Sequence, residues 1–419
     1  MLRLSKGNLV SDKAALPAPH IFYGWFVVAA AFAVTFVDFG CAYSFSAFVA
    51  PLQQDFGISR GSVSLVFSLA GFLYFSLGMV SGPLADRWGS RQMAVIGMIL
   101  IGLGLAAASA ARSLPEVYAA YGLGVGFGVG CSYVPAMGAV QRWFVRRRGF
   151  TSGLASAGIG VGTLAVPPFA SFLIGAMGWR EAYLILGVLA AIVGVSMALL
   201  IANDPRDRGL APDGDVVRAN VQADLSGGAS MREAITSRRF IGLYAACFAC
   251  SFGVFVPFVH LAPYAVDHGV TPARGVLLVG AIGVGSAAGR FFLGGIADWL
   301  GREVSLAAMF VGMALALVIW LVSTDYWPLA AFAFVFGVAY GGWVALLPAV
   351  VMDYFGGRNV SGLIGVLYTS VGFGTLIGPS ASGFAFDVTG SYTIPIVASI
   401  LANVIAAGIT IATSRPSRA

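Results

Sequence analysis

Charged residues are scarce in this 419-residue sequence, of which Asp, Glu, Lys and Arg make up 10% and hydrophobic residues 58%. Soluble domains carry about 25% charged residues, so the composition excludes a water-soluble globular protein. A membrane β-barrel is excluded too, because its strands would alternate polar and apolar residues, whereas the apolar runs here are continuous. The lipid bilayer is therefore the expected solvent of most of this chain.

Cysteine is also rare, and all four cysteines fall inside apolar runs: Cys41, Cys131, Cys247 and Cys250. The last two share a helix face, but no further Cys or His stands at ligand spacing, so they indicate a metal site only weakly. We expect the four to pack as small side chains. No metal and no cofactor is expected.

Signatures of catalysis are missing as well. The sequence contains no Walker-type nucleotide loop and no nucleophile accompanied by a base. We therefore expect neither an enzyme nor a protein driven directly by ATP. The net charge of +6 needs no nucleic acid to explain it, because the basic residues are explained by membrane topology, as described below.

Long apolar runs fill the rest of the chain. Runs of about 20 residues with almost no charge cross a hydrocarbon core of about 30 Å as helices. Twelve such spans are predicted, at residues 21–50, 58–80, 93–112, 115–140, 150–176, 181–202, 240–265, 275–296, 304–323, 327–352, 360–385 and 391–413. The expected fold class is an all-α membrane protein with 12 transmembrane helices, and the first apolar run is expected to be a retained span.

A long polar segment at residues 203–239 divides the twelve spans into six and six. We expect one short surface helix near residues 231–239 and otherwise irregular chain. The expected organisation is a tail at 1–20, a six-helix bundle at 21–202, a linker at 203–239, a second six-helix bundle at 240–413 and a tail at 414–419.

Basic residues are distributed unevenly between alternate loops. Of the 24 lysines and arginines, one lies inside a span and only four lie on the side opposite the linker: Arg60, Arg112, Arg180 and Arg274. Because basic loops stay in the cytoplasm, both termini and the linker are expected there, in a multi-pass protein of the inner or plasma membrane. Arg146, Arg147 and Arg148 are also able to bind anionic lipid, but topology is the simpler explanation.

An internal repeat relates the two halves. GPLADRWGSR at residues 82–91 aligns with GGIADWLGRE at 294–303, and GTLAVP at 162–167 aligns with GTLIGP at 374–379, both at an offset of 212 residues. Two motifs at one offset indicate a duplicated six-helix unit in a single orientation. This parallel repeat is typical of transporters whose halves rock around a site at the membrane midplane.

The motif at residues 82–91 resembles the signature between helices 2 and 3 of the major facilitator superfamily. RWFVRRRGFTSGLASAGIGVG at 142–162 and YGWFVV at 23–28 are similar to patterns of its monocarboxylate porter family. The resemblance implies the major facilitator fold and a cytoplasmic charge gate that holds the helix ends together in the outward-open state. The matching gate residues are Asp86, Arg87, Arg91, Asp298 and Arg302.

Small residues follow helical spacing in the second of these motifs, where they allow another helix to pack backbone to backbone. They are Gly153, Ala155, Ala157, Gly158 and Gly162.

One arginine, Arg290, lies within an apolar span. It precedes Asp298 by eight residues, which places it about 12 Å from the cytoplasmic end of its helix. A lone charge at this depth costs at least about 2.5–3.5 kcal/mol, and the positions one turn away are Ser286 and Gly294 rather than acids. A structural ion pair is possible in principle, but we expect Arg290 to face a central cavity and bind a substrate carboxylate, whose geometry its guanidinium matches.

Two further ionisable residues lie well inside spans and are proton-coupling candidates. His260 stands near the outer end of the seventh span between Pro257 and Pro263, and its solution pKa near 6.5 suits a proton carrier that also contacts the substrate. Asp38 lies about 24 Å into the first span and is the second candidate. An outward-solvated histidine and a structural aspartate are the alternatives.

The resemblance also exposes a difference. Mammalian monocarboxylate porters carry a lysine in the outer part of helix 1 and an acid one turn before the helix 8 arginine, where this chain has Tyr43 and Ser286. The lysine and acid relay therefore does not carry over, although Tyr43 stays a candidate substrate contact. Bacterial relatives favour a helix 7 histidine, here His260. Tyr133 and Tyr340, at nearly equivalent places in the repeat, are further candidates for hydrogen bonding to substrate, packing being the alternative.

Together these features predict a secondary transporter of small monocarboxylates such as lactate or pyruvate, coupled to protons and acting as a monomer. An oxalate–formate type exchanger is the alternative, although such exchangers use a second cation on helix 11 and residues 362–380 contain no Lys or Arg. A non-transporting sensor is a further alternative, disfavoured because the linker is short.

Overall fold

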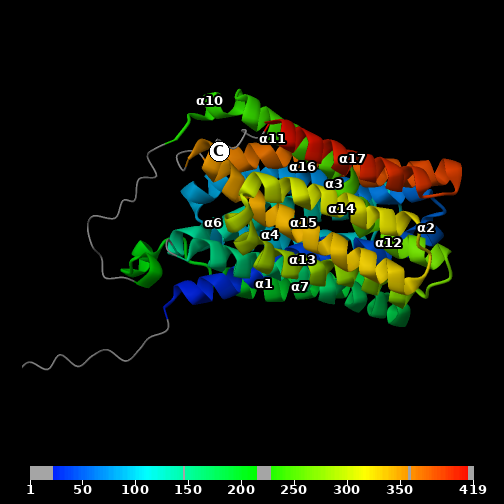
Figure 1. Ribbon diagram of the computed structural model, residues 1–419. Coiled ribbons are helices and arrows are strands. Elements are labelled where there is room, and N and C mark those ends of the chain that lie inside the picture. The colour runs from blue at the N-terminus through cyan, green and yellow to red at the C-terminus, as the bar shows by residue number, and fades with distance from the viewer. Residues whose placement is uncertain (1–21, 145–146, 215–227, 357–359, 414–419) are drawn as a thin grey trace, which may run out of the picture.

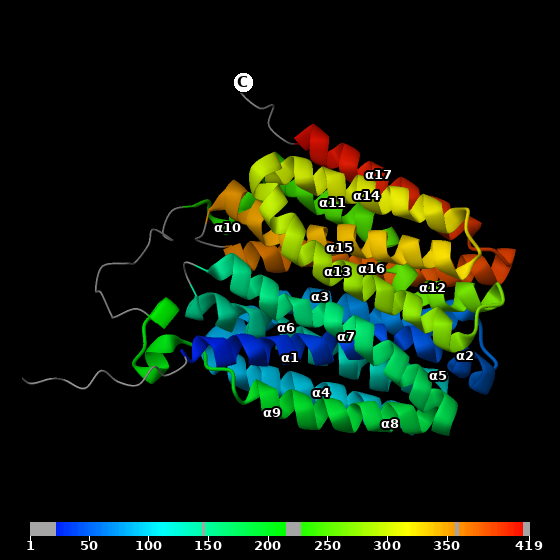
Figure 2. The same ribbon diagram turned by 60° about the horizontal axis from the view of Figure 1, so that its bottom comes forward.

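The computed structural model describes residues 22–144, 147–214, 228–356 and 360–413. Within these ranges, the side chains of Asp86, Arg148, residues 294–299 and residues 360–361 lie outside the described part. Twelve helical spans in the described chain are long and apolar enough to cross a membrane, as predicted. They form two six-helix bundles, which lie one above the other in Figure 2.

The first bundle contains α1 to α9. Its elements are α1 (Gly24–Tyr43), α2 (Phe45–Phe56), α3 (Arg60–Trp88), α4 (Ser90–Ser109), α5 (Leu114–Val117), α6 (Gly124–Trp143), α7 (Arg148–Met177), α8 (Trp179–Leu189) and α9 (Val195–Ala198). Single π-helical turns, Tyr118–Leu123 and Ala190–Gly194, join α5 to α6 and α8 to α9.

The second bundle contains α11 to α17, preceded by a short linker helix. Its elements are α10 (Met231–Ile235), α11 (Arg238–Val254), α12 (Val256–Asp267), α13 (Pro272–Leu300), α14 (Arg302–Leu321), α15 (Tyr326–Phe355), α16 (Val360–Thr389) and α17 (Thr393–Thr413). The short helix α10 lies where the sequence predicts one, and Ser230 and Glu233 form a capping box at its start.

Both ends of the described chain lie at the end of the molecule where the linker runs (Figure 1). We call this the linker end and the other the far end. Several helices run farther toward the linker end than predicted, since α3 reaches Trp88 and α13 reaches Leu300. The repeat motif at these places is polar but still helical, and each helix ends before a glycine with a positive φ, 100° at Gly89 and 92° at Gly301. Such backbone favours glycine, which explains why the repeat retains it.

The first span of each bundle is broken between two helices. Ser44 separates α1 from α2, and Phe255 separates α11 from α12 two residues before Pro257. A proline removes a backbone donor and loosens the helix before it. The breaks fall at nearly equivalent places in the repeat, and Phe255 at the second break lines the central cavity.

Two long helix pairs form most of the seam between the bundles: α3 packs on α16, and α7 packs on α13. The second pair approaches closely, because a Cβ added at Gly160 would lie 2.7 Å from the carbonyl oxygen of Gly283. Within the first bundle, Gly158 and Gly162 of α7 face backbone carbonyls of α1, as the small-residue pattern predicts. Nothing lies within 4 Å of a Cβ added at Gly153, so this glycine does not take part in close packing.

Candidate functional site

A narrow central cavity lies between the two bundles, and the space in it for the centres of water molecules is about 20 Å³. Aromatic side chains form most of its wall: Phe39, Phe75, Tyr133, Phe255, Tyr340, Trp343 and Tyr368. Four aliphatic residues, Ile159, Val344, Leu347 and Val371, complete it together with Arg290. Helices from both bundles therefore surround one charged group.

Arg290 of α13 is buried, with 4% of its surface exposed. One terminal nitrogen, Nη1, donates a hydrogen bond to Oγ of Ser286 one turn earlier, and the guanidinium lies 5.8 Å from the centre of the Tyr340 ring. Nε and Nη2 have no hydrogen-bond partner, and Arg290 forms no ion pair with any residue the structure describes. Buried charges are normally paired, so the two unpartnered donors beside the cavity make Arg290 a candidate for binding an anion.

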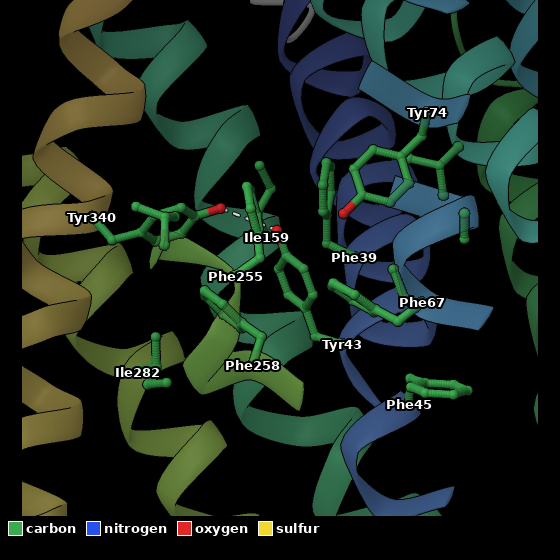
Figure 3. Packing of buried hydrophobic residues seen from close by; sticks show 14 of the residues in the cluster. Phe39, Tyr43, Phe45, Phe67, Tyr74, Ile159, Phe255, Phe258, Ile282 and Tyr340 are labelled. Carbon is green, nitrogen blue, oxygen red and sulfur yellow. Dashed lines mark hydrogen bonds between the residues drawn. The ribbon is translucent and has the colours of Figure 1, made fainter. Parts of the chain in front are cut away.

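Tyr340 and Tyr43 link the two bundles beside this arginine. Their hydroxyl groups are 3.0 Å apart, and Figure 3 shows them meeting between α1 and α15. The ring of Tyr43 also stacks on Phe258 with centroids 4.4 Å apart. Tyr43 is not part of the cavity wall itself, whereas Tyr133 and Tyr340 are.

Asp38 lies behind the cavity wall and is fully buried in α1. Its Oδ1 accepts a hydrogen bond of 2.6 Å from Ser132 of α6, while its Oδ2 has no partner. The neighbouring residues Phe39 and Tyr133 line the cavity and meet edge to face, 5.2 Å apart. Asp38 is thus one residue removed from the cavity and makes no ion pair within the described part of the chain.

Comparisons with known proteins agree with this architecture. The sequence matches the Major Facilitator Superfamily over residues 30–324 and 241–418. It is 33% identical to mouse monocarboxylate transporter 11, over 92% of this chain and 86% of the relative. It is 28% identical to human monocarboxylate transporter 2, over 90% and 82%. The chain belongs to the monocarboxylate transporter family of the Major Facilitator Superfamily.

The fold of this family member also matches a solved structure, a bacterial homolog of the human lysosomal transporter Spinster in an inward-facing and unoccupied conformation. The TM-score is 0.73 at 16% identity, covering 95% of this chain and 99% of the other. Membership of a transporter family also agrees with the expectation that the chain is not an enzyme. In the described residues, no group of three or more His, Cys, Asp or Glu is placed to hold a metal ion.

His260 lies outside the cavity wall of this transporter, toward the far end. Its Nε2 is 2.8 Å from the carbonyl oxygen of Pro379, and its Nδ1 is 2.9 Å from the hydroxyl of Tyr392. Because a carbonyl only accepts, Nε2 carries a proton, and in the neutral ring Nδ1 accepts from Tyr392. Burial raises the pKa of Tyr392 although Arg60 opposes this, so its hydroxyl stays protonated and able to donate.

The far end contains the charged contacts that join the two bundles. Arg60, at the start of α3, forms an ion pair of 2.6 Å with Asp267 of α12 and donates a hydrogen bond of 3.0 Å to Tyr392. The carboxylate of Asp387 in α16 accepts from the backbone N–H groups of Arg60 and Gly61, at 2.9 and 2.8 Å. Sequence reasoning missed this cluster, because three charges at helix ends are typical of exposed loops.

At the linker end, two arginines of the expected gate, Arg91 and Arg302, have contacts within their own bundles. Arg91 donates to the carbonyl oxygen of Ile201 at 2.7 Å, Arg302 forms an ion pair of 2.7 Å with Asp353, and Arg87 is exposed. The side chains of Asp86 and Asp298 lie outside the described part. The cytoplasmic gate therefore stays a prediction.

Proposed function

We propose that this protein is a secondary transporter that carries small monocarboxylates, of the size of lactate or pyruvate, together with protons. The observation that carries the proposal is the buried guanidinium of Arg290, whose Nε and Nη2 lack partners beside the cavity. A guanidinium presents paired donors that match a carboxylate, and it keeps its charge at any physiological pH. A bound carboxylate would supply the missing acceptors and neutralise the buried charge.

The charge of the cavity supports a monoanion over a dianion. Arg290 is the one charged side chain among the described residues of the wall, and α16 contributes Tyr368 and Val371 rather than a cation. A second carboxylate in this cavity would be desolvated without a counter-charge, which is costly. Exchange of oxalate is therefore the weaker alternative.

We further propose that the two bundles rock to give alternating access. The protein is proposed to be a monomer in the inner or plasma membrane, with the linker and both termini in the cytoplasm. In the arrangement described, the far end is joined by Arg60, Asp267 and Asp387. Under this orientation the outer face is closed, so uptake requires these contacts to open. The gate at Asp86 and Asp298 would close the opposite face in turn.

His260 is the proposed proton carrier, and the hydrogen-bond chain supports this role. Arg60 donates to Tyr392, Tyr392 donates to Nδ1 of His260, and Nε2 donates to Pro379. Protonation of Nδ1 would turn it from an acceptor into a donor, so the hydroxyl hydrogen of Tyr392 would lose its acceptor. It would also add a positive charge close to Arg60. An external proton would thereby weaken the closed far end and favour the outward-open state. Asp38, with its unpartnered Oδ2, is the second candidate.

The experiment is uptake of labelled lactate, pyruvate, formate and oxalate into proteoliposomes, with and without an inward proton gradient. Arg290→Ala is compared with Arg112→Ala, which removes an exposed arginine at the far end. We expect gradient-stimulated monocarboxylate uptake that is lost only in Arg290→Ala. Uptake unaffected by Arg290→Ala would place the binding site elsewhere, and gradient-independent oxalate exchange would assign the chain to the exchangers.

A further inference from the structure

A second hollow lies at the linker end of the first bundle, far from the proposed substrate site. The end of α3, the start of α4 and the segment after α9 form its wall, with Trp88, Gly89, Arg91, Gln92, Ala202, Asn203, Asp207 and Arg208. The space in it for the centres of water molecules is about 430 Å³, against about 20 Å³ in the central cavity. This hollow therefore has room for a polar group of several atoms.

Two arginines of this wall are each held by one contact. Nε of Arg91 donates a hydrogen bond of 2.7 Å to the carbonyl oxygen of Ile201, and its two terminal nitrogens have no partner among the described residues. The guanidinium of Arg208 lies 3.5 Å from the centre of the Tyr23 ring. Because a guanidinium binds phosphate oxygens through paired donors, the hollow presents two groups that suit a phosphate.

The charge of the hollow favours one kind of phosphate. Asp207 lies in the same wall as Arg91 and Arg208, so two positive charges and one negative charge leave a single positive charge. A phosphodiester carries one negative charge and matches it. A phosphate monoester carries about 1.5 to 2 negative charges at neutral pH, so part of its charge would stay uncompensated. Phospholipids such as phosphatidylglycerol carry a phosphodiester in their headgroup.

The outer face of α4 continues from the hollow as an apolar surface. Ile96, Ile99 and Leu103 are exposed, and they follow Gln92 of the hollow at helical spacing, so the four residues lie on one face of the helix. This helix lies on the side of the first bundle away from the second (Figure 2). Trp88 in the wall is 59% exposed, and exposed tryptophans are typical of the headgroup level of a membrane. Lipid tails along α4 would therefore bring a headgroup to the hollow.

The repeat does not provide the same charges in the second bundle. At the offset of 212 residues, Glu303 stands where the first bundle has Arg91, and Val304 stands where it has Gln92. An acid at this place would repel a phosphate. The basic side chain at the start of α4 is therefore a property of the first bundle alone and not a requirement of the duplicated fold.

From these observations we infer that the hollow binds the phosphodiester headgroup of a phospholipid in the leaflet at the linker end. Arg91 and Arg208 contact the phosphate, and the tails lie along the exposed face of α4. Inorganic phosphate shares the chemistry of the headgroup but has no tails to contact α4. The inference uses neither Arg290 nor the central cavity, so it does not depend on the proposed function.

The test is native mass spectrometry of the purified protein in detergent, titrated with phosphatidylglycerol. A parallel titration uses diacylglycerol with the same tails, which lacks the phosphate, and inorganic phosphate is added as a competitor. A hydrogen bond to a charged group changes binding by about tenfold or more. We therefore expect phosphatidylglycerol to bind at least tenfold more tightly than diacylglycerol and to stay bound at an equal concentration of inorganic phosphate. Equal binding of the two lipids, or displacement by inorganic phosphate, would overturn the inference.

Three variants locate the site. The double variant Arg91→Gln, Arg208→Gln should weaken the tightest phosphatidylglycerol site about tenfold, whereas Arg232→Gln, which removes an exposed arginine of α10 outside the hollow, should leave it unchanged. Asp207→Asn should strengthen binding, because it removes the negative charge from the wall, and a gain of affinity does not arise from misfolding. An unchanged affinity in the double variant, an equal loss in Arg232→Gln, or weaker binding in Asp207→Asn contradicts the placement.

Discussion

Arg60 and Asp267 form an ion pair of 2.6 Å between residues of different bundles, and 13% and 34% of their side chains are exposed. The carboxylate of Asp387 adds two hydrogen bonds from the backbone at the start of α3. All of these contacts lie at the far end. The far end is therefore where charge stabilises the closed arrangement of this structure.

Asp267→Asn should shift the molecule toward opening at the far end. A partly exposed ion pair contributes up to about 1 kcal/mol, so we expect a change of up to about fivefold in the ratio of open to closed states. Distances between spin labels at Arg112 and Thr271, one on each bundle, report this ratio by electron resonance. The matched control is Asp55→Asn, which breaks a pair of 2.7 Å with Arg180 inside the first bundle and should leave the distances unchanged. An equal response in both variants would remove the gating role of Asp267.

His260→Gln should separate transport from the proton gradient. Glutamine keeps a donor and an acceptor for Pro379 and Tyr392 but does not take up a proton at physiological pH. We expect exchange of labelled substrate across the membrane to persist and the stimulation by an inward gradient to disappear. The measurement compares counterflow with gradient-driven uptake in the same proteoliposomes.

Asp38→Asn is the companion variant, since it removes the other proton-coupling candidate while keeping the contact with Ser132. We expect it to retain stimulation by the gradient. If instead Asp38→Asn abolishes stimulation and His260→Gln retains it, Asp38 is the carrier and the hydrogen-bond chain at the far end is structural.

Gly158→Ala should destabilise the first bundle. A Cβ at this position would lie 2.2 Å from the carbonyl oxygen of Phe32 in α1, and overpacking of this kind costs about 1–3 kcal/mol. Gly153→Ala in the same helix meets no atom within 4 Å and should be neutral or mildly stabilising, because alanine favours helix. Thermal unfolding of the purified variants in detergent distinguishes them, and equal melting temperatures would show that α7 does not need this close contact.

The sequence predicts the spans, the repeat and the cavity arginine because each depends on local or periodic information. A buried Arg290 follows from its position in an apolar run, without any knowledge of its neighbours. The rotation of a helix about its axis is different: α1 is buried on most sides, so apolar periodicity does not show that Asp38 faces α6 and Tyr43 faces α15. The position of His260 along its span likewise does not show that its side chain contacts Tyr392, which is 132 residues away.

Long-range pairs are hidden from the sequence for a related reason. Arg60 and Asp267 are 207 residues apart, and Tyr43 and Tyr340 are 297 residues apart. Each pair exists only because the two bundles face each other in this structure, and local sequence patterns do not show which residues meet there. The signature motif points to a gate at the linker end, whereas the described inter-bundle ion pair lies at the far end.

Tyr43→Phe and Tyr340→Phe should have different effects although they delete the same hydrogen bond. Loss of the bond costs about 1 kcal/mol, so both variants should raise the ratio of open to closed states by about fivefold. The spin-label distances report this ratio. Only Tyr340 lines the cavity, so only Tyr340→Phe should also weaken binding of a monocarboxylate. Binding is measured by titration calorimetry on the purified protein, with Tyr118→Phe as the control, because that hydroxyl bonds to Ser62 inside the first bundle. Equal losses of affinity in Tyr43→Phe and Tyr340→Phe would mean that the bond between the bundles, and not a substrate contact, sets the affinity.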